Sequence, residues 1–367
     1  MIFKGRPTRT PTSTSADREE RPSREACLRF SKTGSILLAV LLHSLSVDMT
    51  PCLAVEPTPT FAEGMALFRR HRFGEAAALF AEVEKGAPGQ TNALLYRGKA
   101  LVNLNRIQEA AAALEQYVAL HPNSDDGFSL LAYIRFRQGR PADSLKLYTR
   151  AAALQTPVAD DLKIVALDYA LLDDYTSAAK YLEMALEIDP GNLEARYHLG
   201  RVRYQQNRFD EAIAAFEAVL RKDPGHVKAQ DNLGLCLEGQ GKLDQAVAAY
   251  HRAIDLDRQS RRRIEQPYLD LGSLLTKTGH ADQAIPLLLR ASQIAPQSSK
   301  SHYELGKTYL DLNQIAPSKE HLERAAQLEP KNSSVHYQLA QVYRRLGKVD
   351  LEKRELQLVE KLTPQQH

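Results

Sequence analysis

The chain has 367 residues, of which 43% are hydrophobic and 25% charged, with no Trp, a composition typical of a water-soluble helical protein. The first 54 residues hold eight Lys or Arg and five Asp or Glu, so the remainder is balanced at 40 of each. That balance excludes a general attraction to nucleic acid or to an anionic membrane. The spacing of Cys27, Cys52 and Cys236 fits neither a zinc site nor a disulfide framework.

Residues 1–31 form a leader rich in Pro, Thr, Ser, Arg and Glu, with too few apolar residues to offset the entropy lost on ordering, which predicts disorder. Residues 32–54 combine a positive flank, a short apolar core at 35–47 and small residues before a cleavage point, the three parts of a secretory signal. We therefore expect a cleaved signal and an exported protein, periplasmic or secreted. The alternative is membrane association through a short anchor at residues 35–47, although a spanning helix needs about 20 apolar residues.

From residue 57 to residue 366 the chain repeats with a period of 34 residues, with units starting at 57, 91, 125, 159, 193, 227, 265, 299 and 333. Position 8 is Gly or Ala in all nine units, and position 20 is Ala or Ser in all but the last, which has Glu352. Position 24 is always large and apolar or aromatic, and position 32 is Pro in seven units. A pattern held over this many units indicates a repeat architecture rather than a single motif.

This pattern, clearest in residues 193–224, resembles the tetratricopeptide repeat (TPR) family. The resemblance implies an all-α fold, an α-solenoid in which about nine TPR helix-turn-helix units form a right-handed superhelix. Small residues at positions 8 and 20 are expected to let paired helices approach closely, and the large residue at position 24 to fill the groove between units. Pro at position 32 ends the second helix, because it has no amide hydrogen to donate.

Three local departures from the pattern are informative. The first unit has the polar residues Thr60 and Glu63 where several others carry apolar residues, which suits a solvent-facing end. Between the sixth and seventh units, residues 261–264 are inserted beside Arg258, and this basic turn is expected to be a solvated, flexible loop rather than an anionic docking site. Pro286 lies inside a second helix and is expected to loosen it.

The repeats leave no segment for a catalytic domain, so we expect no enzymatic activity, no cofactor and no small-molecule substrate. Residues 301–308 end in Gly-Lys-Thr like a phosphate-binding loop, but they fall inside a predicted helix, where the backbone amides are already used. His302 and His336 occupy equivalent positions without further ligands at metal spacing, so we expect no metal site. Cys236 lies between two leucines and is read as a small buried hydrophobe.

In TPR proteins the concave face is lined by positions 2, 5, 9 and 12 or 13 of each first helix. The resemblance implies that an extended peptide or a partner helix lies there. Aromatic rings interleaved with cations suit a partner that offers carboxylates and apolar side chains. The predicted partner-binding residues in this groove are Tyr133, Phe136, Arg137, Tyr197, Arg201, Tyr204, Tyr303, Lys307, Tyr337, Gln341, Arg344 and Arg345.

The sequence therefore predicts a scaffold or adaptor for protein-protein interaction that is exported and binds a peptide or partner protein in its groove. It predicts no nucleic-acid partner. A second hypothesis is a regulatory or targeting subunit of an enzyme encoded elsewhere, resembling TPR regions attached to transferases or kinases.

Overall fold

A computed structural model describes residues 60–261 and 263–363, and all regular structure in these residues is α-helical. This confirms the all-α prediction. The predicted disordered leader and the signal or anchor at residues 32–54 lie outside the described residues.

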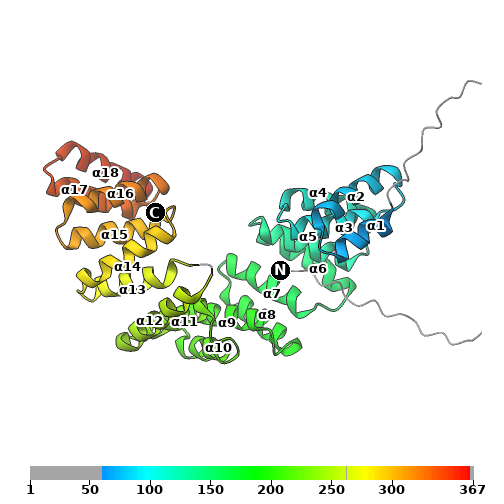
Figure 1. The fold of residues 1–367 in the computed structure, drawn as a ribbon, viewed down its shortest axis with the longest axis horizontal. Helices are drawn as coiled ribbons and strands as arrows, with labels where there is room; N and C mark the ends of the chain where they lie inside the picture. Colours follow the sequence, from blue (N-terminus) through cyan, green and yellow to red (C-terminus); the bar gives the residue numbers. More distant parts are fainter. Residues whose placement is uncertain (1–59, 262, 364–367) are drawn as a thin grey trace, which may run out of the picture. The chain divides into compact units, whose positions relative to one another are not determined.

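Eighteen helices are found in the described residues, and they follow one another as nine consecutive pairs (Figure 1). Within each pair the odd-numbered helix is the first helix of a repeat and the even-numbered helix is the second. The bounds are α1 Phe61–Arg69, α2 Phe73–Gly86, α3 Asn92–Asn103, α4 Ile107–Leu120, α5 Asp125–Arg137, α6 Pro141–Leu154, α7 Ala159–Leu171, α8 Tyr175–Ile188, α9 Leu193–Gln205, α10 Phe209–Lys222, α11 Val227–Gly239, α12 Leu243–Gln259, α13 Gln266–Lys277, α14 Ala281–Ile294, α15 Ser299–Asp311, α16 Ile315–Leu328, α17 Ser333–Arg345 and α18 Val349–Leu362.

The chain divides into two compact units, one ending at Leu120 and the other beginning at His121. The first unit contains the helices α1 to α4, and the second contains α5 to α18. Every predicted partner-binding residue belongs to the second unit.

One backbone feature ends every first helix. Position 15 of each repeat has a positive φ, from 57° at Asn207 to 83° at Gly279. The next residue then donates its N–H to a carbonyl five residues back, as Lys242 does to Leu237 at 2.9 Å. This is the Schellman arrangement, which Gly, Asn and Asp adopt most readily because their left-handed conformation is least strained. The residues concerned are His71, Asn105, Gly139, Asp173, Asn207, Gly241, Gly279, Asn313 and Gly347.

Paired helices touch where position 8 faces positions 20 and 24 of the same repeat. A Cβ built on Gly200 would lie 2.7 Å from Phe216 at position 24, so only a small residue fits. Where position 20 is Ser, the hydroxyl donates to the position 8 carbonyl, as Ser318 does to Gly306 at 2.8 Å. The expected close approach is therefore present.

The expectation that position 24 fills the groove between repeats is correct in part. The position 24 side chain packs first on the glycine of its own repeat, as Phe80 does on Gly64. The outer edge of the position 24 side chain reaches the next repeat, since the ring centres of Phe80 and Tyr96 are 6.0 Å apart. One large side chain thus serves both interfaces.

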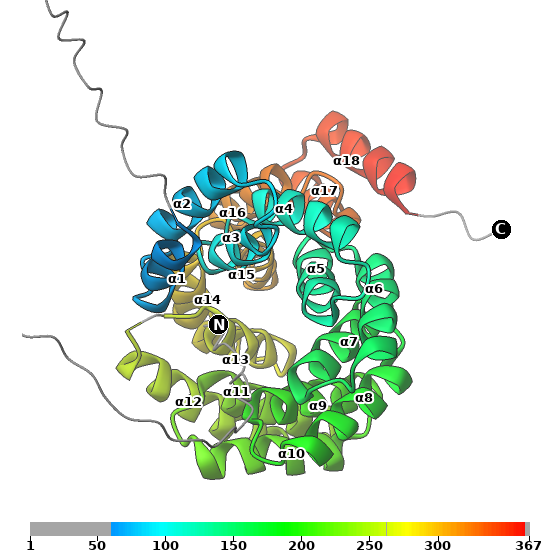
Figure 2. The same cartoon turned by 90° about the vertical axis from the view of Figure 1, so that its right-hand side faces the viewer.

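In the second unit the first helices lie on the inner side of the solenoid. Each contacts the next first helix, from α5 with α7 to α15 with α17, whereas no two second helices of the described chain contact one another. Figure 2 shows α6, α8 and α10 outside α5, α7 and α9. Consecutive first helices are closer because the stack curves around them. Each of the odd-numbered helices α5 to α17 has one side that faces away from its paired second helix. We call the surface formed by these sides the inner face.

Two of the three departures from the repeat pattern lie at the start of α1 and inside α14. Thr60 and Glu63 form a capping box at the start of α1, in which the Thr60 N–H donates to Glu63 at 2.8 Å and the Glu63 N–H to Thr60 at 3.3 Å. Their polarity therefore starts a helix, besides facing solvent. Pro286 does not break α14, which continues from Ala281 to Ile294.

The insertion between the sixth and seventh repeats is tied to the fold by one buried carboxylate. With Arg258 in place of the usual Pro, α12 runs on to Gln259, because nothing removes the amide hydrogen there. Asp257 is fully buried and accepts the Ile264 N–H at 2.9 Å, while Arg263 lies 3.8 Å from its other oxygen. The basic turn is thus anchored at Asp257 rather than only solvated.

Candidate partner-binding face

The predicted residues on α5 are largely occupied with one another. Tyr133 is buried, and its hydroxyl accepts a hydrogen bond from Arg137 at 2.8 Å. The Arg137 guanidinium also lies 5.7 Å from the Tyr133 ring centre, and the Phe136 ring lies 6.5 Å from that ring. These three residues form one cluster on a single helix, and Tyr133 is its buried member.

The residues on α9 differ in how much surface they offer. Tyr197 is half-buried, and its hydroxyl accepts a hydrogen bond from Asn232 of α11 at 2.9 Å. Tyr204 is half-buried against Phe209, with ring centres 5.7 Å apart. Arg201 is exposed and makes no ion pair in the described residues, so its charge is accessible from solvent.

The residues on α15 also leave a cation available. Tyr303 and Lys307 are half-buried, and burial raises the pKa of Tyr303, which keeps its hydroxyl neutral. The nearby Gln338 side chain of α17 partly offsets this rise in the pKa. Lys307 makes no ion pair within the part of the chain that the structure describes.

Of the predicted residues on α17, the two arginines are used inside the protein. Arg344 donates to Glu352 of α18 at 2.7 Å. Arg345 donates to the carbonyl of Leu310 at 2.6 Å and thereby caps the end of α15 in the preceding repeat. Tyr337 is 48% exposed and Gln341 is half-buried, and neither side chain makes a hydrogen bond or ion pair among the described residues.

Sequence reasoning missed a buried lysine on the inner face. Lys163 of α7 is 1% exposed, and its ammonium group lies 2.9 Å from Asp160 and 2.8 Å from Glu194 of α9. Beside it, burial and then the charge of Arg201 lower the pKa of His198 to about 4, so that this imidazole is neutral at pH 7. The signal was a Lys at position 5, where the repeats on either side carry Ser129 and Tyr197.

A pair of buried aspartates was also missed. Asp231 of α11 is 3% exposed and Asp270 of α13 is 7% exposed. Gln266 donates to both oxygens of Asp270, at 2.8 and 2.9 Å, whereas Oδ1 of Asp231 is buried without a hydrogen-bond partner among the described residues. Burial, and then the charge of Asp270, raises the pKa of Asp231 well above its usual range.

The residues considered for chemistry have structural roles in the fold. Gly306, Lys307 and Thr308 lie within α15, and the Thr308 hydroxyl donates to the Glu304 carbonyl at 2.7 Å. Cys236 is fully buried, and burial raises the pKa of its thiol to about 12, which suppresses the reactive thiolate. In residues 60–261 and 263–363, no group of three or more His, Cys, Asp and Glu is placed to hold a metal ion.

The two equivalent histidines hold turns in place. His302 and His336 each approach a carbonyl of the turn before their helix, Pro296 at 3.3 Å and Pro330 at 3.0 Å. Their second ring nitrogens face position 23 of the same repeat, where His302 meets His321 at 3.2 Å and His336 meets Glu355 at 2.6 Å. Both histidines therefore link the turn, the first helix and the second helix of one repeat.

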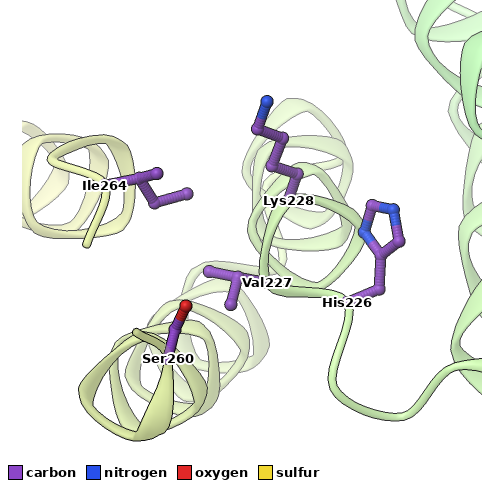
Figure 3. A pocket seen from close by; sticks show the side chains of 5 residues that line it. All are labelled: His226, Val227, Lys228, Ser260 and Ile264. Carbon is purple, nitrogen blue, oxygen red and sulfur yellow. The ribbon is translucent and has the colours of Figure 1, made fainter. Parts of the chain in front are cut away.

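One pocket lies beside the insertion, with a volume of about 250 Å³. Figure 3 shows that its lining comes from the start of α11, the end of α12 and the segment just before α13. The lining residues are His226, Val227, Lys228, Ser260 and Ile264. The His226 ring is used as the cap of α11, because its Nδ1 accepts the Ala229 N–H at 3.0 Å. Among the five lining residues, Lys228 is the one with an exposed charged side chain, so the pocket offers few groups for chemistry.

No helix in the described part of the chain is long and apolar enough to cross a membrane. The predicted anchor at residues 35–47 lies outside the described residues.

Paired helices that stack through small residues and present one continuous face of first helices define a helical repeat scaffold. Models of the tetratricopeptide repeat match residues 61–125, 197–261 and 299–332. A model described as anaphase-promoting complex, cyclosome, subunit 3 matches residues 137–219. The chain belongs to the tetratricopeptide repeat family.

Individual relatives are distant. BBSome complex member BBS4 of Bos taurus is 24% identical over 227 residues, which are 60% of this chain and 36% of the relative. Cytochrome c-type biogenesis protein CycH of Rhizobium meliloti (strain 1021) is 32% identical over 110 residues, 29% of this chain and 28% of the relative. The chain thus spans about a third of the length of the curated relatives it matches. A solved tetratricopeptide repeat protein of Parabacteroides merdae has a TM-score of 0.57 at 17% identity, with 72% of this chain and 98% of that chain covered.

Proposed function

We propose that this protein is a non-catalytic adaptor that holds a segment of another protein along the inner face of α5 to α17. TPR scaffolds generally bind proteins or peptides, and the inner face is the surface that packing of the repeats leaves accessible. The bound segment is extended or helical, because the face is a continuous surface built from successive helices rather than an enclosed cavity.

The observation that carries this proposal is a row of tyrosines at position 5. Tyr197, Tyr303 and Tyr337 recur at the same place on α9, α15 and α17, and each keeps part of its ring accessible. Beside them, Arg201 and Lys307 have no ion-pair partner in residues 60–261 and 263–363. Tyr and Arg side chains contribute much of the binding energy in protein interfaces, since they combine apolar area with directed hydrogen bonds.

Site-specific photocrosslinking tests the proposal. A photoreactive amino acid at Arg201 or at Tyr303 is expected to capture the same partner, because both lie on the inner face. The control carries the photoreactive residue at Glu217, which is exposed on the second helix α10. Capture from Glu217 alone, or from no position, would contradict binding on the inner face.

A second candidate is a subunit of a larger assembly that contains a separate enzyme. It is favoured by the match of residues 137–219 to subunit 3 of the anaphase-promoting complex and by the likeness to a BBSome complex member. Native purification distinguishes the two. A catalytic chain present in fixed stoichiometry supports a subunit, and a partner that leaves on dilution supports an adaptor.

We further propose that residues 32–54 direct export and are then removed. The positive flank and short apolar core support this reading. Cell fractionation of the full chain and of a chain lacking residues 1–54, with N-terminal sequencing of the product, tests it. Equal distribution of both chains and an uncleaved N-terminus would reject export, and an uncleaved chain in the membrane fraction would favour the anchor.

A further inference from the structure

Consecutive first helices contact one another through the same repeat positions, so the molecule provides its own comparison. Position 5 of one repeat meets positions 2 and 6 of the next. Between α7 and α9, Lys163 meets Glu194 at 2.8 Å. Between α9 and α11, Asn232 donates to Tyr197 at 2.9 Å. In both junctions a donor meets an acceptor, as buried polar groups require.

The junction of α11 and α13 breaks this rule. Asp231 stands at position 5 and Asp270 at position 6 of the next repeat, and the charge of Asp270 acts on Asp231, so two acceptors lie near each other. Both carboxyl groups are more than nine-tenths buried, and the Gln266 amide is the one donor that the described residues supply. Oδ1 of Asp231 has no hydrogen-bond donor within residues 60–261 and 263–363. Burying a carboxylate without a hydrogen-bond donor costs free energy. A cation that donates hydrogen bonds to the carboxylate would offset that cost.

The surrounding charged groups do not fill this gap. Glu238 of α11 is held by Lys277 at 3.1 Å and by the Tyr250 hydroxyl at 3.0 Å. Lys300 of α15 lowers the pKa of both aspartates through space. Its side chain is exposed, and it forms no ion pair with either aspartate in the described residues. The pair therefore has an excess of acceptors, and it carries uncompensated negative charge once both carboxyl groups are ionised.

We propose that Asp231 and Asp270 together bind one cationic side chain, a lysine ammonium or an arginine guanidinium, of the protein segment on the inner face. The inference rests on the proposed adaptor function and specifies the chemistry of its partner. A guanidinium or ammonium group donates several charge-assisted hydrogen bonds. It supplies the donor that Asp231 lacks and displaces the Gln266 amide from Asp270.

The experiment uses methylguanidinium and butylammonium as probes of the two side chains, with the full chain labelled at the Asp carboxyl carbons. NMR titration is expected to give saturable shifts of the Asp231 and Asp270 carboxyl signals. Tetramethylammonium, which carries the same charge but has no hydrogen to donate, is the control ion and should give no saturable shift. The double variant Asp231→Asn and Asp270→Asn is expected to weaken binding of the probes at least tenfold, whereas Asp282→Asn, an exposed aspartate of α14, should leave it unchanged.

Three results would overturn the inference: no saturable shift with either probe, equal shifts with tetramethylammonium, or binding that appears only after Lys300→Gln, since Lys300 would then be the natural occupant. The partner captured by photocrosslinking separates this inference from the adaptor function. If the double variant retains that partner with unchanged affinity, the cation site is wrong while the adaptor function stands. If no partner is captured from the inner face at all, the adaptor function fails whatever the probes show.

Discussion

Gly234 and Tyr250 lie so close that a Cβ built on the glycine would be 2.6 Å from Cε1 of the tyrosine ring. The ring is fully buried, so it cannot move aside into solvent. The same relationship joins position 8 and position 24 in the other repeats that carry glycine. It explains why the small residue and the large residue recur together.

The first prediction is that Gly234→Val lowers the free energy of unfolding by about 1 to 3 kcal/mol, because the added side chain overpacks the contact with Tyr250. Thermal or urea denaturation measures this. Gly74→Val is the control, since the space around Gly74 in α2 is open. Equal losses in both variants would show that helix propensity, and not packing, is responsible.

The second prediction concerns the end of α11. Gly241 has a φ of +73°, and a side chain there is expected to cost about 1 kcal/mol. Gly241→Ala should therefore lower the unfolding midpoint. Gly225→Ala, in the turn before α11 and with ordinary van der Waals space at its Cβ, should change it much less. A neutral Gly241→Ala would contradict the role of the left-handed residue in ending the helix.

The third prediction concerns the link between α17 and α15. Arg345→Gln removes the hydrogen bond to the Leu310 carbonyl and should destabilise the last repeat by about 0.5 to 1.5 kcal/mol. Hydrogen exchange is expected to speed up in α17 and α18 more than in α5 and α6, because a terminal repeat depends on one neighbour. Arg354→Gln, on the exposed side of α18, serves as the control. Uniform acceleration along the chain would argue against a local link.

The fourth prediction is a pH dependence caused by Asp168. This residue of α7 is fully buried, and neither carboxyl oxygen has a hydrogen-bond partner in the described chain, since the nearby Ser144 hydroxyl donates to the Ala132 carbonyl at 2.9 Å. Burial raises the pKa of Asp168 to about 7. The folded protein therefore retains a proton that the unfolded chain releases near the ordinary Asp pKa of about 4.

Because the folded state binds the extra proton, the stabilising contribution of Asp168 is complete below pH 4 and is lost as the pH rises to 7. The Asp168→Asn side chain stays neutral at every pH. The unfolding free energy of this variant, relative to that of the natural protein, should therefore rise by at most about 1.4 kcal/mol per pH unit across this window. Denaturation at pH 5, 6, 7 and 8 measures the difference. A difference that does not change with pH would contradict the buried acid.

The sequence was sufficient to predict the repeat and its core. The 34-residue period specifies which positions are equivalent, and the small and large residues at positions 8 and 24 specify how a pair of helices packs. The positive φ at position 15 was not predicted, although Gly, Asn, Asp or His stands there in every unit. The function of position 24 was predicted only in part, since a period shows that a residue recurs but not which neighbour it meets first.

The inner face was predictable as a surface but not as a set of available groups. Periodicity placed Arg137, Arg201 and Arg345 alike on first helices. Only the tertiary structure shows that Arg137 donates to Tyr133 and Arg345 to a carbonyl 35 residues away, while Arg201 has no ion-pair partner among the described residues. The same holds for Asp231 and Asp270, whose pairing depends on the contact between two successive helices. Repetition determines where a side chain points, whereas its charge balance depends on which partner the next repeat brings within hydrogen-bonding distance.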